Sequence, residues 1–244
     1  MSQIWANLIN LKDHFINELD NTGTETFEEG MERFNKPGWV NRVWESKDYR
    51  RAHVDVVDAR DSKGLWMMHV CIFPHLDNDG PIFGFDVVAG KNKMTGAFHD
   101  FSPSVNNDHS MIDHFTKTAS MLEWKREREL PDWAKAIFNS SMVAAGNLSD
   151  ENEINQLMYT VKANLEYYML NIGSFNSNCD IDLVTSAQNR YAFYQKQNPH
   201  TPKTMKALGL DDDDVELFIH KCLFPEIETK QKPQLDLLNF VLDI

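Results

Sequence analysis

Residues His53–Asp86 have the sequence HVDVVDARDSKGLWMMHVCIFPHLDNDGPIFGFD, in which three apolar segments alternate with two short polar breaks. The segments are rich in Val, Ile, Phe and Trp, which favour strands. The breaks, Asp61–Gly64 and His75–Pro81, contain the Asp, Asn, Gly and Pro residues that form turns. Short connections favour antiparallel pairing, because parallel strands need a longer crossover. We therefore predict a meander of antiparallel strands.

The same pattern extends to both sides of this stretch. We predict strand structure from Trp39 to about Phe101, and apolar residues at three- and four-residue steps predict helices elsewhere. The clearest strand segments are Ala52–Asp58, Leu65–Phe73, Ile82–Ala89 and Thr95–Asp100. The predicted helices are Ile4–Leu19, ending near Gly23, and about Met111–Leu122, Ile154–Met169, Ser186–Gln197 and Asp213–Leu223. This order indicates an α+β fold with helices on both faces of an antiparallel sheet.

Composition fits a single globular domain that spans residues 1–244. Of the 244 residues, 42% are hydrophobic and 11% aromatic, which allows a large core without cross-links. The three cysteines (Cys71, Cys179 and Cys222) are odd in number and widely spaced. We therefore expect buried thiols rather than a disulfide framework or a metal site.

Charge and hydropathy argue against two classes of partner. The net charge of −13 opposes binding to phosphate backbones, so nucleic acid is not expected. No apolar run reaches the roughly 20 residues of a membrane helix. Lys12 and Asp13 lie within the first amphipathic segment, which therefore does not resemble a signal peptide. We expect a soluble, cytoplasmic protein with no membrane partner.

Four ionisable residues stand where a strand would carry apolar side chains: His53, Asp55, His69 and Asp86. If residue 55 pairs with 69 and residue 69 with 86, Asp55, His69 and Asp86 form a row across three strands. Buried acids beside an imidazole have shifted pKa values and can donate protons near neutral pH. A slip of one residue would break the row, and a water-facing sheet would make these side chains ordinary surface residues. The pattern alone leaves both possibilities open.

The sequence lacks the motifs of metal sites, phosphate-binding loops and catalytic triads. The His and Asp residues have no Cys or Glu at a spacing typical of metal ligands. The sequence also has no glycine-rich phosphate loop and no Ser-His-Asp signature. The pattern therefore gives only weak support for a metal site, and no motif for phosphate binding or nucleophilic catalysis is present.

Four ordered blocks resemble the ferredoxin-dependent bilin reductases, and most of all the members that form phycocyanobilin. The blocks are RRAHVDV (Arg50–Val56), HVCIFPHLDNDGPIFGFDVVAG (His69–Gly90), DFSPS (Asp100–Ser104) and RELPDW (Arg128–Trp133). The resemblance covers about Trp39 to Phe138. It implies an α/β/α sandwich in which an open-chain tetrapyrrole lies between the sheet and the C-terminal helices. It also implies a biliverdin IXα substrate, radical intermediates, and single electrons from reduced ferredoxin without a bound flavin, metal or nicotinamide.

The resemblance also assigns roles to individual residues. Asp86 corresponds to the catalytic aspartate that hydrogen-bonds the pyrrole nitrogens and donates a proton, and His69 to its partner histidine. His53 corresponds to a second histidine near the D ring. Thr95 stands where the phycocyanobilin-forming members have a small hydroxyl residue beside a propionate. The family further implies the cytoplasm of a cyanobacterium or of a phage-infected cell.

Asp55 departs from the phycocyanobilin-forming members, which use a glutamate here to reduce the D-ring vinyl group. An aspartate is one methylene shorter, and proton delivery falls off sharply with such misplacement. We therefore expect the vinyl group to survive, and biliverdin to become phycoerythrobilin through a dihydrobiliverdin. Phycocyanobilin is the alternative product, and a bilin carrier without catalysis is the alternative function.

Two further departures concern the substrate. Pro199 stands where the family has an aspartate used in A-ring protonation, so either another acid substitutes or that step is slow. An arginine that binds a propionate is missing around Met142–Gly146. Ferredoxin is acidic, as is this chain, so docking requires a local basic patch. The available cations are Lys47, Arg50, Arg51, Lys91, Lys93, Lys125 and Arg126.

Overall fold

A computed structural model describes residues 2–105, 108–124, 128–174 and 179–228 of the chain. The strands are β1 (Thr24–Thr26), β2 (Trp39–Glu45), β3 (Tyr49–Ala59), β4 (Leu65–Pro74), β5 (Ile82–Gly90), β6 (Met94–Ser102) and β7 (Val143–Leu148). The α-helices are α1 (Gln3–Thr22), α2 (Arg60–Lys63), α3 (Ser110–Ala119), α4 (Asp132–Lys135), α5 (Glu151–Asn171), α6 (Ile181–Gln195), α7 (His200–Ala207) and α8 (Asp212–Leu217). Short helical turns are η1 (Glu32–Phe34), η2 (Ile172–Ser174) and η3 (Phe218–Leu223).

The strands of the described residues form one sheet in the order β1-β2-β3-β4-β5-β6-β7, with every neighbouring pair antiparallel. Strand order therefore equals chain order, and the predicted meander is confirmed. The four clearest predicted segments correspond to β3, β4, β5 and β6. The two edge strands, β1 and β7, were not predicted.

One face of the sheet packs against α1, α3 and α5. Leu8, Leu11, Phe15 and Leu19 place the apolar stripe of α1 on this face, and all four are fully buried. Phe15 packs between Phe83 and Phe85 of the sheet, with ring centroids 5.8 and 6.0 Å away. Each such side chain contributes about 1.5–3 kcal/mol through burial. This layer is a solid apolar core.

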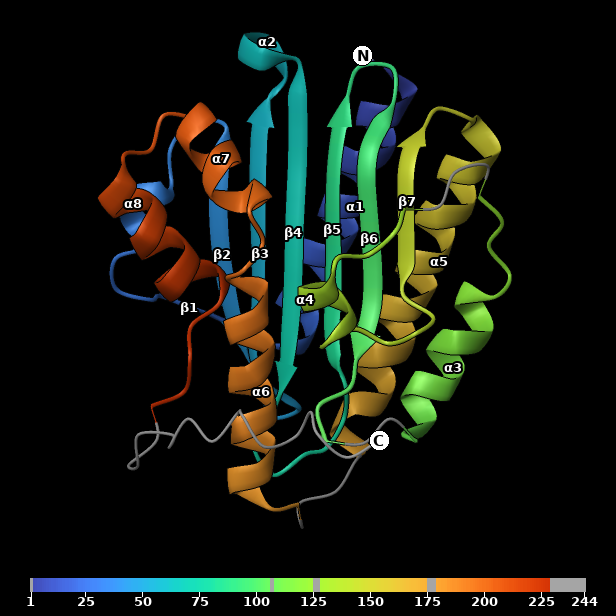
Figure 1. Ribbon diagram of the computed structural model, residues 1–244, viewed down its shortest axis with the longest axis vertical. Coiled ribbons are helices and arrows are strands. Elements are labelled where there is room, and N and C mark those ends of the chain that lie inside the picture. The colour runs from blue at the N-terminus through green and yellow to red at the C-terminus, as the bar shows by residue number, and fades with distance from the viewer. Residues whose placement is uncertain (1, 106–107, 125–127, 175–178, 229–244) are drawn as a thin grey trace.

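The other face is covered by α4, α6, α7, α8 and η3 (Figure 1). Phe218 in η3 contacts Phe34 and Trp39 at ring centroid distances of 4.9 and 5.3 Å. Tyr191 of α6 lies over Phe73 of β4. The sheet thus lies between two helical layers, which confirms the predicted α/β/α sandwich.

Helix positions differ from the predicted ones in the C-terminal layer. Helix α6 begins at Ile181, five residues before the predicted start, because the Asp180 side chain accepts hydrogen bonds from the backbone of Asp182 and Leu183. Helix α7 was not predicted. Asp211 caps α8 in the same way, as the acidic run before Val215 indicated.

The cysteines of the described residues form no disulfide bond. Cys71 and Cys222 are buried, as expected, whereas Cys179 is only partly buried. Among the residues that the structure describes, none of the helices has the length and apolar content needed to span a membrane.

Candidate active site

The central strands have the register on which the polar row depended. Asp55 of β3 pairs with His69 of β4, and His69 pairs with Asp86 of β5. Phe98 of β6 continues the row opposite Asp86. Because directly paired residues point to the same face of a sheet, two carboxyl groups flank one imidazole.

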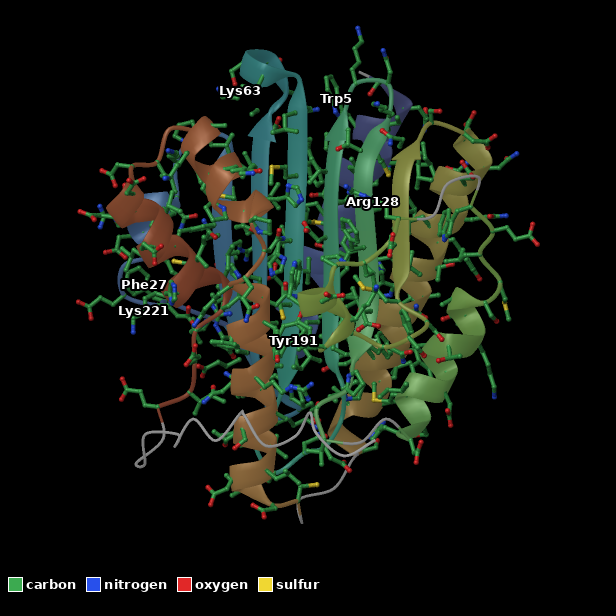
Figure 2. All side chains as sticks on the ribbon, viewed as in Figure 1. Trp5, Phe27, Lys63, Arg128, Tyr191 and Lys221 are labelled. Atoms are coloured by element: carbon green, nitrogen blue, oxygen red, sulfur yellow. The ribbon has the colours of Figure 1, made fainter. Side chains whose placement is uncertain are left out.

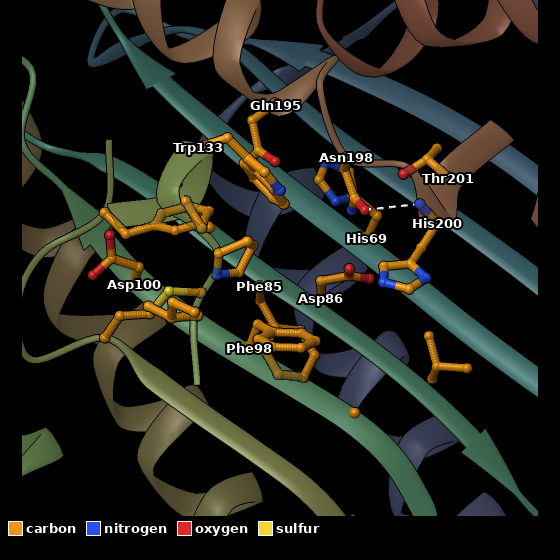
Figure 3. A pocket seen from close by; sticks show the side chains of 18 of the residues that line it. His69, Phe85, Asp86, Phe98, Asp100, Trp133, Gln195, Asn198, His200 and Thr201 are labelled. Atoms are coloured by element: carbon orange, nitrogen blue, oxygen red, sulfur yellow. Dashed lines mark hydrogen bonds between the residues drawn. The ribbon is translucent and has the colours of Figure 1, made fainter. Parts of the chain in front are cut away.

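This row faces a cavity of about 850 Å³. The cavity lies between the sheet and the layer formed by α4, α6, α7 and Phe224, and Figure 3 shows His69 and Asp86 pointing into it. A cavity of this size suits an organic ligand or cofactor. The row is therefore not a water-facing surface, which was the alternative that the sequence left open.

Asp55 is buried and held by one strong hydrogen bond. The Trp39 Nε1–H donates to Asp55 Oδ1 at 2.7 Å. Burial raises the pKa of Asp55 to about 7, the Trp39 bond opposes this rise, and the charge of Asp86 adds to it. Since Oδ1 accepts the indole N–H, the proton of the neutral acid resides on Oδ2. Asp55 can therefore donate a proton near neutral pH.

His69 is neutral at physiological pH. Burial lowers its pKa to about 4, and the positive charge of Arg51 lowers it further. Its ring meets Phe224 edge-on, with centroids 5.4 Å apart. Within the described residues, His69 Nε2 has no hydrogen-bond partner. Its Nε2 is therefore a buried polar atom that no described residue satisfies.

Asp86 completes the row. Burial raises its pKa to about 6, against the lowering effect of a hydrogen bond from the Val87 backbone. Two acids of near-neutral pKa, with a neutral imidazole between them, can supply protons to a ligand above the row. This is the arrangement that acid catalysis requires.

His53 lies beside the row rather than on the cavity lining. Its ring centroid is 6.3 Å from that of His69, and its Nε2 is 3.1 Å from Asn41 Oδ1. Since an amide oxygen only accepts, His53 donates this bond. Burial lowers its pKa well below the ordinary value, with smaller effects from Arg51 and His69. His53 is therefore a neutral neighbour of His69.

Thr95 lines the cavity because of a β-bulge. Val88 pairs with Gly96 but Ala89 pairs with Met94, so Thr95 is the extra residue of β6. Its hydroxyl donates to the Val88 carbonyl at 3.1 Å. The hydroxyl must give up this bond before it can donate to a ligand carboxylate.

Sequence reasoning missed several polar residues that line the cavity, among them Asp100, Arg128 and His200. Asp100 and Arg128 lie in two of the blocks quoted above, which was the available signal. Burial raises the pKa of Asp100 to about 7, with hydrogen bonds from Asn139, Ser102 and Phe101 opposing the rise. His200 follows Pro199 at the start of α7, and its backbone N–H donates to Asn198 Oδ1 (Figure 3).

The cations proposed for ferredoxin docking do not form one patch. Arg51 is buried and paired with Glu28, and Arg50 lies over the Phe73 ring and donates to Gln188. Lys47 is in the β2–β3 turn, at the opposite end of the sheet from Lys91 and Lys93 in the β5–β6 turn (Figure 1). Lys125 and Arg126 lie outside the described residues.

Comparison with known proteins identifies the family. The family model for ferredoxin-dependent bilin reductase matches residues 23–225. The chain belongs to the ferredoxin-dependent bilin reductases. This bilin reductase is therefore an oxidoreductase, with ferredoxin as its electron donor.

Individual relatives agree with this assignment. The bilin reductase is 29% identical to phycocyanobilin:ferredoxin oxidoreductase of Prochlorococcus marinus (strain MIT 9515), over 90% of this chain and 88% of the relative. The solved structure of a protein named PcyX is 38% identical, with a TM-score of 0.70 over 91% of this chain and 99% of the other. Tomato phytochromobilin synthase, solved in complex with biliverdin, shares the fold at 17% identity, with a TM-score of 0.67 over 87% and 82% of the two chains.

Proposed function

We propose that this bilin reductase converts biliverdin IXα to phycoerythrobilin in two successive two-electron reductions through a dihydrobiliverdin. The row of Asp55, His69 and Asp86 beneath the 850 Å³ cavity is the observation that carries this proposal. Reduced ferredoxin supplies four electrons one at a time, so radical states occur between the steps. The protein and solvent supply the four protons that balance them.

Asp86 is the first proton donor in this scheme. A bilin over the row excludes water from the cavity, which favours the neutral acid further. The acid then hydrogen-bonds the pyrrole system and transfers its proton when an electron arrives. Neutral His69, which lines the cavity, hydrogen-bonds the bilin, and His53 holds His69 in place from outside the cavity. Thr95 contacts a propionate at the bulge.

Asp55 determines the product in this proposal. Its side chain is short, and the Trp39 N–H holds Oδ1 at 2.7 Å and so restricts the movement of the carboxyl group. We assign Asp55 to reduction of the C15 bridge, because the D-ring vinyl group lies beyond its reach. The A ring is reduced in the second step.

Anaerobic incubation with biliverdin, ferredoxin and a reductant tests this assignment, with absorbance spectra and product chromatography as the measurements. We expect phycoerythrobilin. The Asp55→Glu variant extends the acid by one methylene and should yield some phycocyanobilin. Asp55→Asn, the matched control, keeps the shape without the proton and should bind biliverdin but fail to reduce the C15 bridge.

Other outcomes contradict specific parts of the proposal. Phycocyanobilin from the unmodified protein would refute the role of Asp55. Binding without any spectral conversion would instead identify a bilin carrier and reject the enzymatic function.

A further inference from the structure

Arg51 is a buried cation on the face of the sheet that carries the polar row. It lies in β3, two residues before His53 and four before Asp55, and alternate residues of a strand point to the same face. Arg51 is only 4% exposed. Its charge lowers the pKa of His69, after the larger effect of burial, so the guanidinium is near the row. Because a buried charge is destabilising unless partners compensate it, the partners of Arg51 indicate its role.

Those partners come from two distant segments of the chain. Arg51 Nε and Nη2 donate to the two carboxylate oxygens of Glu28 at 2.7 and 2.8 Å. Nη2 also donates to the Cys222 carbonyl at 2.8 Å. Figure 2 shows Phe27 and Lys221, the residues just before these two partners, on the same side of the molecule. Arg51 therefore joins the segment after β1 and the C-terminal helical layer to β3.

The Cys222 carbonyl belongs to the last turn of η3, which is a π-helix. Carbonyl groups at the end of a helix lack a partner within the helix, and π-turns are frequent at functional sites. The chain leaves η3 at Phe224, whose N–H donates to the Ile219 carbonyl at 3.0 Å. The Phe224 ring lines the cavity and meets His69 edge-on at a centroid distance of 5.4 Å. The bond from Arg51 thus fixes the backbone two residues before the ring that contacts the imidazole.

We propose that Arg51 is a positioning residue of this reductase, which through the Cys222 carbonyl holds Phe224 against His69 as one wall of the bilin cavity. This inference rests on the proposed function, because it takes the ligand of the cavity to be a bilin. Glu28 accepts two parallel hydrogen bonds from the guanidinium and so fixes its plane, which leaves Nη2 aimed at the carbonyl. Without Arg51 the Phe224 ring is free to move away from the imidazole.

A double-mutant cycle tests whether Arg51 acts through Phe224. We would measure the dissociation constant of biliverdin by absorbance titration for Arg51→Gln, for Phe224→Ala and for the double variant. Each single variant should bind biliverdin about tenfold more weakly, the effect of losing one aromatic wall. The double variant should bind no more weakly than Phe224→Ala, because the two changes remove the same contact.

Arg42→Gln is the matched control. Arg42 Nε and Nη2 donate to the two carboxylate oxygens of Glu25 at 2.8 and 2.7 Å, the same paired geometry as between Arg51 and Glu28. Arg42 pairs with Val54 between β2 and β3, so it lies on the opposite face of the sheet from the polar row. This variant loses the same charge and the same kind of ion pair, and it should bind biliverdin normally.

NMR of the unligated protein gives a readout that does not depend on bilin binding. The ring protons of His69 lie beside the aromatic ring of Phe224, so their chemical shifts report its position. The His69 signals should move in Arg51→Gln in the same direction as in Phe224→Ala, and they should stay in place in Arg42→Gln. Glu28→Gln retains Arg51 and should give a smaller movement in the same direction. This last variant tests the inference even where Arg51→Gln does not fold.

Two results would overturn the inference. One is a loss of about a hundredfold in the double variant, since independent effects multiply. The other is a set of His69 signals that stay in place in both Arg51→Gln and Glu28→Gln. Failure of the unmodified protein to bind biliverdin would reject the proposed function instead, and the His69 signals would still show whether Arg51 holds Phe224.

Discussion

Burial sets the protonation state of each residue in the polar row. The carboxyl groups of Asp55 and Asp86 have pKa values raised to about 7 and about 6, whereas the pKa of the His69 imidazole is lowered to about 4. All three shifts favour the uncharged form, because burial penalises charge of either sign. Near neutral pH the mobile protons therefore reside on the carboxyl groups, and the imidazole is a neutral hydrogen-bonding partner.

The rate of reduction should consequently fall as the pH rises. Proton donation needs the neutral acids, and the coupled pair of carboxyl groups loses its protons over about pH 6 to 7. Because kcat/KM reports the first proton transfer, which the proposed function assigns to one acid, Asp86, we expect it to be highest below this range and to fall tenfold per pH unit above it. A pH series of anaerobic turnover, with biliverdin binding measured at each pH, tests this expectation.

Asp86→Asn is the control for this pH series. The amide keeps the shape of the side chain but cannot donate a proton as an acid. The variant should bind biliverdin with a similar dissociation constant and stop at a radical or unreduced bilin, visible in the absorbance spectrum. Normal turnover in Asp86→Asn would remove this residue from the mechanism.

At the scale of elements, Asp100 connects β6 to the wall of the cavity. Its Oδ2 accepts a hydrogen bond from Ser102 Oγ at 2.7 Å and another from the Asn139 backbone at 3.0 Å. Asn139 lies between α4 and β7, in the segment whose neighbours Trp133 and Phe138 line the cavity. Asp100 therefore holds that segment against the sheet.

Substitutions at Asp100 separate this positioning role from proton donation. Asp100→Ala removes both hydrogen bonds and should weaken biliverdin binding about tenfold or more, with a lower melting temperature. Asp100→Asn can keep both bonds by placing its amide oxygen at the Oδ2 position. It should bind and reduce biliverdin at nearly the normal rate. Loss of turnover with normal binding in Asp100→Asn would instead make Asp100 a proton donor.

The elements differ in how well the sequence predicts them. Strands β3 to β6 carry long apolar patterns and clear turns, and α1 and α5 have continuous apolar stripes with helix-terminating or capping residues. By contrast, β1 has three residues and α4 has four. These elements are too short to show the alternation of a strand or the three- and four-residue spacing of a helix. Strand β7 consists largely of small residues (VAAGNL), and its position depends on pairing with β6. Such elements are stabilised by tertiary contacts rather than by local propensity.

The same distinction applies to the candidate site. Asp55, His69 and Asp86 lie on adjacent strands with short turns, so the sequence permitted the register that forms the row but did not fix it, and the structure has that register. Arg128 reaches the cavity from a segment far along the chain and only because Gly96 and Gly146 lack side chains. Periodicity carries no information about such a long-range contact.

At the scale of the whole molecule, three exposed lysines lie at the two ends of the sheet. Lys63 at the end of α2 and Lys91 in the β5–β6 turn lie at one end, near the bulge at Thr95 and the border of the cavity, and Lys47 lies in the β2–β3 turn at the other end. The net charge of −13 repels an acidic partner at long range. Docking therefore depends on a local region of positive charge, and electron transfer requires that region to be close to the bilin.

We expect ferredoxin to dock at the end that carries Lys63 and Lys91. Lys91→Glu should raise the KM for ferredoxin several-fold at low salt, with a smaller effect at high salt, because exposed charges are screened. The dissociation constant of biliverdin should not change. Lys47→Glu makes the same change in net charge at the opposite end and should leave the KM for ferredoxin nearly unchanged. Equal effects of the two variants on the KM for ferredoxin would show that the total charge of the protein, rather than one docking site, governs the encounter. A larger effect of Lys47→Glu would place ferredoxin at the other end of the sheet.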